Sequence, residues 1–193
     1  MKRVILSLLV ALSLGTATAA NASDPKAFVD GLGAQVLSVV KNDALSKTEK
    51  QAKIEAMFSD KVDINFVAKF VLGKSWRTAT PQQQQAYIAA YKPFILKNYA
   101  SKLTKYSGQT YTLKAARIDG DASVVPMEIN DPSGQNIHVD YRLQSNGGNF
   151  KVVDITVEGV SLLATQRSEF SGIIENKGVD GLIEALKSQV AGK

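Results

Sequence analysis

The hydrophobic period of this chain changes twice along its length. Up to about residue 106, large apolar residues recur every three or four positions, which is the spacing of amphipathic helices. From Tyr111 to Val157 the period becomes two, as in strands with one buried face, and after Leu162 the helical spacing returns. Because helices, a run of strands and more helices follow one another, the pattern predicts an α+β domain.

Cap signals locate the helices that precede the strands. Asp24-Pro25 and Thr80-Pro81 each join a capping side chain to Pro at the first helical position, where its missing N–H is not needed. They predict one helix from about residue 25 and a long helix from about residue 81. Between them, the spacing predicts a charged helix over 46–58 and a more apolar helix over 63–72 that ends at Gly73.

The long helix carries a broad aromatic face. Its apolar residues recur every four positions at Tyr87, Tyr91, Ile95, Tyr99 and Leu103. Pro93 lies inside this pattern, where it cannot donate to the carbonyl four residues back and clashes with it. We therefore expect a kink or a break near residues 89–93.

Turn signals divide the middle of the chain into four expected strands, at about 111–118, 122–129, 136–144 and 149–157. The third alternates most clearly, with apolar Ile137, Val139, Tyr141 and Leu143 on one face and polar His138, Asp140 and Arg142 on the other. The parity of the fourth is ambiguous by one residue, because Val152 and Val153 are both apolar. These strands predict a four-stranded antiparallel meander with several helices packed on one face.

Two further helices follow the strands. Ser161 is placed to cap the first of them, and Gly178 is expected to end it. A short closing helix then starts at Asp180.

The first 22 residues have the features of a secretory signal peptide. Lys2 and Arg3 precede a run of low polarity over residues 4–14, and small residues follow as far as Ala22. Cleavage there removes 22 of 193 residues and leaves residues 23–193 as a single domain. The chain contains 0 Cys, so its stability must come from a core rather than from disulfides.

The charge balance and the small number of reactive residues argue against several classes of function. Without the signal segment, 21 basic residues stand against 18 acidic ones, and the basic residues form no dense stripe, which argues against nucleic-acid binding. The single histidine, His138, is expected on the solvent face, and there are too few Cys and His for a transition-metal site. Gly159-Val160-Ser161 lacks the second Gly of a nucleophile elbow, because Leu163 stands there. We therefore expect no enzymatic activity and no cofactor, and interpret Asp154 as a structural hydrogen-bond partner.

Two sequence segments resemble segments of a known protein family. Residues 71–81 read VLGKSWRTATP, and residues 153–170 read VDITVEGVSLLATQRSEF, on either side of the strands. In this order they resemble the MlaC family of periplasmic phospholipid-binding proteins, also called toluene-tolerance proteins. The resemblance implies a monomeric periplasmic carrier with an enclosed apolar cavity for the acyl tails of a phospholipid. It also implies shuttling between an outer-membrane lipoprotein–porin complex and an inner-membrane ABC-type transport complex, which maintains outer-membrane lipid asymmetry.

The same resemblance suggests which residues form the cavity wall. They are Phe66, Val71, Leu72, Trp76, Tyr99, Val139, Tyr141, Val160 and Leu162. The chain departs from the family pattern at Gln82–Gln85, where an acidic residue is expected, and at Pro93. Three other functions stay open on the sequence: a carrier of another hydrophobic ligand, an esterase using Ser161, and an adaptor that binds no ligand.

Overall fold

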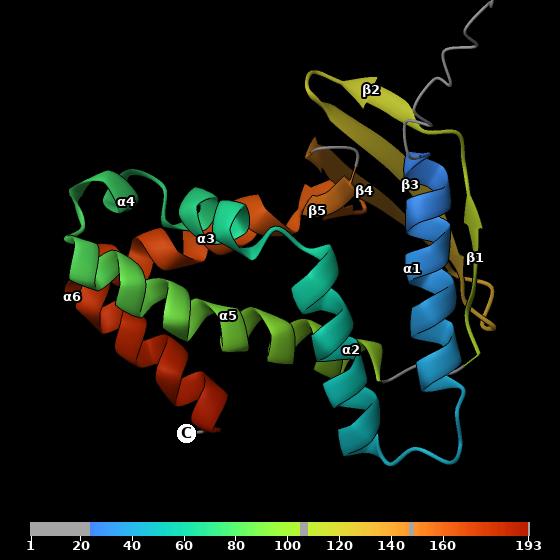
Figure 1. Cartoon of the computed structure of the whole chain (residues 1–193), viewed down its shortest axis with the longest axis horizontal. Helices are drawn as coiled ribbons and strands as arrows, with labels where there is room; N and C mark the ends of the chain where they lie inside the picture. The colour runs from blue at the N-terminus through green and yellow to red at the C-terminus, as the bar shows by residue number, and fades with distance from the viewer. Residues whose placement is uncertain (1–23, 105–107, 147–148, 193) are drawn as a thin grey trace, which may run out of the picture.

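The computed structural model describes residues 24–104, 108–146 and 149–192 (Figure 1). The expected signal peptide, residues 1–22, lies outside this range. The helices are α1 Pro25–Val40, α2 Lys47–Lys61, α3 Ile64–Leu72, α4 Lys74–Thr78, α5 Pro81–Leu103 and α6 Leu162–Ala191. The strands are β1 Thr110–Leu113, β2 Arg117–Asp119, β3 Ala122–Asn130, β4 Asn136–Asn146, β5 Asn149–Val157 and β6 Val160–Ser161.

The two caps expected from the sequence for the helices before the sheet, Asp24 and Thr80, are present, and Ser46 and Asp63 also act as caps at the expected helix starts. Asp24 accepts a hydrogen bond from the Lys26 N–H, and Asp63 accepts one from the Phe66 N–H. Ser46 and Thr80 form reciprocal capping boxes with the side chains three residues later. These side chains satisfy N–H groups that lack a partner within the helix, which is why four helices begin where the cap residues predict.

Two helical details differ from expectation. The short helix α4 was not predicted, because its five residues carry no apolar period. Helix α5 continues through Pro93 without a break. By contrast, Gly178 has φ 67° inside α6, a left-handed conformation that interrupts the helix as predicted.

The sheet is antiparallel but has six strands, so the prediction of four strands is wrong. The first expected strand is divided into β1 and β2, which both pair with β3, and the short β6 pairs with β5. The order is β1-β3-β4-β5-β6. The division falls at residues 114–116, and Lys114 there still donates its N–H to the Pro126 carbonyl at 2.9 Å.

A β-bulge explains the ambiguous parity of β5. Leu143 pairs with Val152, whereas Arg142 pairs with Asp154, so Val153 is an extra residue on β5. Because of this extra residue, Val152 lies on the same face as Leu143, and Ile155 and Val157 also lie on that face. Both Val152 and Val153 are buried.

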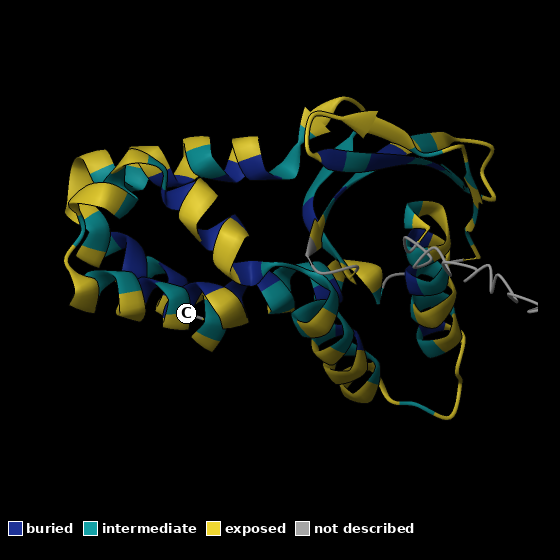
Figure 2. Ribbon diagram, turned by 45° about the horizontal axis from the view of Figure 1, so that its top comes forward, coloured by how far each residue is buried: buried dark blue, intermediate teal, exposed yellow. Residues whose placement is uncertain are grey.

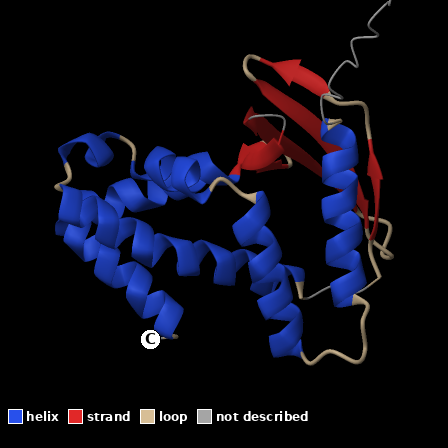
Figure 3. Ribbon diagram, viewed as in Figure 1, coloured by secondary structure: helices blue, strands red, loops and turns tan. Residues whose placement is uncertain are grey.

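A small buried cluster of Val40, Ile54 and Ala100 joins α1, α2 and α5, and two large buried clusters form the rest of the core. One joins α3, α5 and α6 around Tyr87, Tyr91 and Phe170, and the other joins α1 to β3, β4 and β5 around Val29 and Leu143. In Figure 3, the strands stand on one side of the molecule and α3 to α6 on the other. Figure 2 shows the sheet curving around α1. Buried residues of β3, β4 and β5 pack in one cluster with Val29 and Leu32 of α1. The fold therefore has a helical part and a sheet part that meet along a seam.

Candidate functional site

A mostly apolar pocket with a volume of about 580 Å³ lies along this seam. Its walls come from α1, α5, the inner face of the sheet and the first turn of α6, with smaller contributions from the end of α2 and from α3. The apolar side chains from α1 and α5 are Leu32, Val36, Leu37, Val40, Ile95, Leu96 and Leu103. Those from the sheet include Met127, Ile129, Ile137, Val139, Ile155 and Val157. A pocket of this size and polarity suits a hydrophobic ligand.

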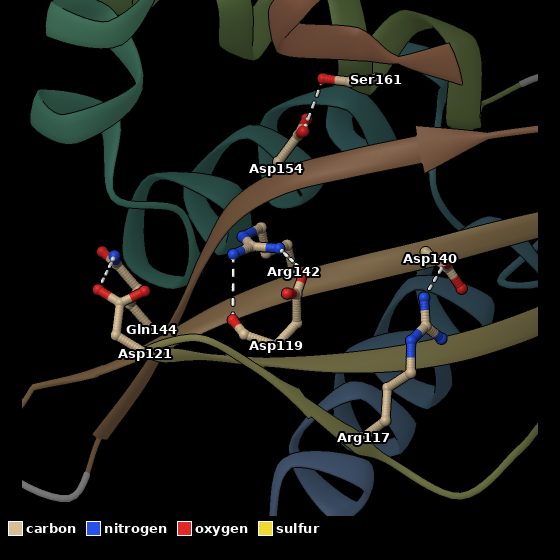
Figure 4. A network of polar contacts seen from close by, with 8 residues as sticks. All are labelled: Arg117, Asp119, Asp121, Asp140, Arg142, Gln144, Asp154 and Ser161. Atoms are coloured by element: carbon tan, nitrogen blue, oxygen red, sulfur yellow. Dashed lines mark hydrogen bonds and ion pairs between the residues drawn. The ribbon is translucent and has the colours of Figure 1, made fainter. Parts of the chain in front are cut away.

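The sheet can supply an apolar wall because its polar side chains point the other way. On the outer face, Arg117 pairs with Asp140 at 2.7 Å, and Arg142 pairs with Asp119 (Figure 4). These exposed ion pairs contribute little stability. They do show that the period of two predicted for β4 holds, with one solvated face and one face toward the pocket.

Helix α1 is held against the sheet by Tyr111. The Tyr111 hydroxyl donates to the Asp30 carbonyl at 3.1 Å and lies 3.0 Å from the Asp30 carboxylate. A Cβ at Gly33 would lie only 2.8 Å from the Tyr111 ring, so glycine is needed for the ring to pass this close to the helix. Burial, and secondarily the hydrogen bond to Asp30, raises the pKa of Tyr111.

Only two charged side chains line this pocket among the described residues, Lys102 and Asp154. Asp154 accepts a hydrogen bond from the Ser161 hydroxyl at 2.6 Å (Figure 4). It also accepts hydrogen bonds from the backbone N–H groups of Ile155 and Leu163. This confirms the structural role predicted for Asp154. Ser161 in turn accepts from the Ala164 N–H at 3.0 Å and is the N-cap of α6, also as predicted.

Besides Tyr111, two further tyrosines line the pocket. Tyr99 comes from α5 and Tyr141 from β4. Burial raises the pKa of each to about 12. Both phenols are therefore neutral at physiological pH, and the charge in the pocket comes from the two residues above.

The structure separates the nine predicted wall residues into two groups. Tyr99, Val139, Tyr141 and Leu162 line the pocket together. Val71 and Leu72 are buried in the helical core instead, and Trp76 packs against the same core. Phe66 is 37% exposed and Val160 is 57% exposed. The segment at residues 71–81 thus contributes to the helical core and does not line this pocket.

The wall formed by α1 was missed by the sequence reasoning. Leu32, Val36 and Val40 are members of the apolar stripe of this helix, and a stripe of that kind is equally typical of a packed core. The signal that could have identified it is the Gly33 position on the same helix, since a glycine inside a helix indicates a close approach.

The other candidate residues do not come together in a catalytic or metal site among the described residues. His138 is exposed, and its backbone N–H donates to the Glu158 carboxylate at 2.5 Å. Within the described ranges, no group of three or more Asp, Glu and His side chains could hold a metal ion. A second pocket of about 380 Å³ is lined by polar residues such as Asp63, Lys92 and Lys151 and suits an apolar ligand less well.

The fold and the pocket together define a class: an α+β protein with an apolar pocket between a curved antiparallel sheet and its helices. The chain belongs to the MlaC protein family, whose model matches residues 31–188. It is 27% identical to the toluene tolerance protein ttg2D of Pseudomonas putida, over 99% of this chain and 91% of that protein. It is 23% identical to the intermembrane phospholipid transport system binding protein MlaC of Haemophilus influenzae, over 67% of this chain and 63% of that protein.

A solved structure shares the fold. It is the phospholipid-binding protein of Ralstonia solanacearum in complex with a phospholipid, with a TM-score of 0.75 and 27% identity. The match covers 88% of this chain and 98% of that protein. In the part of the chain that the structure describes, no helix is long and apolar enough to cross a membrane.

Proposed function

We propose that this protein is a non-enzymatic periplasmic carrier of phospholipids that holds acyl tails in the pocket between α1, α5 and the sheet. The observation that carries the proposal is the nearly continuous apolar wall of that pocket. Its support comes from the relatives, since the Ralstonia protein binds a phospholipid and the Haemophilus protein is named as part of an intermembrane phospholipid transport system.

Energetics explain why a carrier needs such a wall. Moving a buried CH₂ group into water costs about 0.8 kcal/mol, so two tails of about 16 carbons would lose on the order of 25 kcal/mol if exposed. Contacts to a headgroup cannot offset a loss of that size. A pocket that replaces the bilayer around the tails makes the bound and membrane states similar in free energy, so lipid can be exchanged in either direction.

The contacts with the tails are proposed for four of the residues predicted from the sequence, namely Tyr99, Val139, Tyr141 and Leu162. They lie on three different elements of the same pocket. To them we add the α1 stripe of Leu32, Val36 and Val40. Dispersion contacts with such walls are non-directional, so the pocket should accept tails of different length and unsaturation.

The wider role follows from the family. In this proposal, residues 1–22 direct export and are removed, and residues 23–193 act as a monomer in the periplasm. The carrier exchanges phospholipid with an outer-membrane lipoprotein–porin complex and with an inner-membrane complex of the ATP-binding-cassette type. The direction of net transport depends on those partners.

A charge placed in the pocket tests the proposal. Val139 is 6% exposed and faces the pocket, so Val139→Asp puts a carboxylate where the tails would lie. We expect a folded protein that copurifies with at least several-fold less phospholipid than wild type. The control is Ile118→Asp, because Ile118 is 77% exposed on β2 and should leave the lipid content unchanged.

A second variant addresses the loss of stability that a buried charge can cause. Val36→Trp fills the pocket with an apolar side chain from the half-buried face of α1. It should also lower the lipid content while circular dichroism shows a folded protein. Wild-type amounts of phospholipid in both folded variants would exclude this pocket as the tail site.

A further inference from the structure

The pocket has an uneven distribution of charge at its edge. Most of its lining residues are buried or half-buried, and the exposed ones are Lys102, Leu103 and Thr110. They lie at the C-terminal end of α5 and the start of β1. Among the described residues, the lining is most exposed at this edge, so we infer that a ligand whose tails fill the interior places its polar end here.

Among the described residues, Lys102 is a charged side chain at this edge whose ammonium group forms no ion pair. No hydrogen bond to the Lys102 ammonium group is present in those described ranges either. Its Nζ lies 5.7 Å from the centroid of the Tyr99 ring, which is itself part of the pocket wall. The ring directs the ammonium group along the wall by a cation–π contact without neutralising its charge.

The other charged residue of the lining, Asp154, is already held by hydrogen bonds within the fold. Asp154 accepts three hydrogen bonds from Ser161, Ile155 and Leu163, and these join β5 to α6. Among the described residues, the lining thus offers one exposed charge, and it is positive. This arrangement favours amphiphiles that carry a negative group next to their tails.

We propose that Lys102 binds the phosphate of the lipid headgroup and makes the pocket prefer phospholipids over uncharged lipids with the same tails. The inference rests on the proposed function and identifies the part of the phospholipid site that binds the headgroup. The side chains of Gln109 and Thr110 lie at the same edge. An exposed ammonium–phosphate contact is weak, so the preference should be modest, about two- to five-fold, and should fall as salt increases.

Lipid selection, measured within one protein sample, tests this subsite. The protein is incubated with excess vesicles that contain phosphatidylcholine, phosphatidylglycerol and diacylglycerol, all with two oleoyl tails. The protein is then separated and its bound lipids are quantified by mass spectrometry. Lys102→Ala and Lys102→Glu should lower the ratio of bound phospholipid to bound diacylglycerol, and the charge reversal should have the larger effect. Lys102→Arg should keep the wild-type ratio.

The matched control is Lys92→Glu, because Lys92 is an exposed lysine of the same helix that does not line this pocket. Lys102 also lies in the last turn of α5, where a cation stabilises the helix. A purely helical role would change stability but not the ratio of bound lipids.

A competition experiment separates a lipid phosphate site from a general anion site. Inorganic phosphate should change the ratio of bound lipids no more than sodium chloride of equal ionic strength. A larger effect would identify a general anion site and overturn the proposal.

The outcomes separate this inference from the proposed function. If Lys102→Glu binds lipid with an unchanged ratio, the phosphate subsite is wrong and the carrier function stands. The subsite is also wrong if the variant loses all lipid, diacylglycerol included. If the wild-type protein binds none of the three lipids, the carrier function itself fails.

Discussion

At the scale of single residues, the interior combines large aromatic rings with paired hydroxyl groups. Tyr87 and Tyr91 are both 0% exposed. The Tyr87 hydroxyl donates to the Ala68 carbonyl at 3.1 Å, and the Tyr91 hydroxyl donates to Gln166 Oε1 at 2.5 Å. Burial raises the pKa of both tyrosines above the usual value of 10.0. Each ring thus fills the core, while its polar end avoids the cost of an unpaired buried group.

Tyr141 provides a test of the effect of burial on the pKa of a tyrosine. Its pKa in the folded protein is raised to about 12 from the ordinary value of 10.0, so the fold favours the neutral phenol. This contribution to stability is complete below about pH 10 and is lost as the pH rises toward about pH 12. No hydrogen bond to the Tyr141 hydroxyl is present among the described residues, so Tyr141→Phe should cost little at neutral pH.

Urea unfolding between about pH 9 and pH 11 measures the effect. The free energy of unfolding of wild type should fall more steeply than that of Tyr141→Phe, and the two curves should diverge by about 1 kcal/mol near pH 11. Parallel curves would show that this phenol titrates normally in the folded protein.

At the scale of elements, α1 depends on one close contact. Gly33 and Gly31 are both inside this helix, but only Gly33 faces the Tyr111 ring. An added Cβ at Gly33 would lie 2.8 Å from the ring, whereas a Cβ at Gly31 would meet nothing within 4 Å. The two positions therefore form a matched pair with the same chemical change.

We expect opposite effects from the two alanine substitutions. Gly33→Ala should displace Tyr111 from Asp30 and destabilise the protein by about 1–3 kcal/mol. Gly31→Ala should stabilise it by about 0.5–1 kcal/mol, since alanine is the better helix former. Chemical denaturation of both variants measures the difference. Equal stabilisation by both would mean that α1 is not held at this distance from β1.

The elements were largely predictable because their signals are local. The Asp24, Ser46, Asp63 and Thr80 caps each act within one helical turn, and the alternation of β4 needs only neighbouring residues. The bulge at Val153 was not predictable, because it depends on how β5 pairs with β4. The division of the first strand likewise depends on its pairing with β3, which a single segment of sequence does not reveal.

At the scale of the whole molecule, the pocket exists because two cores meet without merging. Val62 packs against both the helical cluster and the sheet cluster, and the pocket lies between α1, α5 and the sheet. The wall therefore depends on the relative placement of α1 and α5, which are 40 residues apart in the chain between Val40 and Pro81. Val71 and Leu72, which the family resemblance suggested as wall, lie in the helical core. A hydrophobic stripe could not have corrected this, because it does not distinguish a wall from a core.

The most direct test of the account is native mass spectrometry of the mature protein, purified from the periplasm without detergent. Denaturation of the same sample releases the ligand for identification. The account predicts a mass increment that resolves into diacyl phospholipids. A homogeneous protein that stays empty after incubation with phospholipid vesicles, or one that carries a different hydrophobic molecule in place of phospholipid, would contradict it.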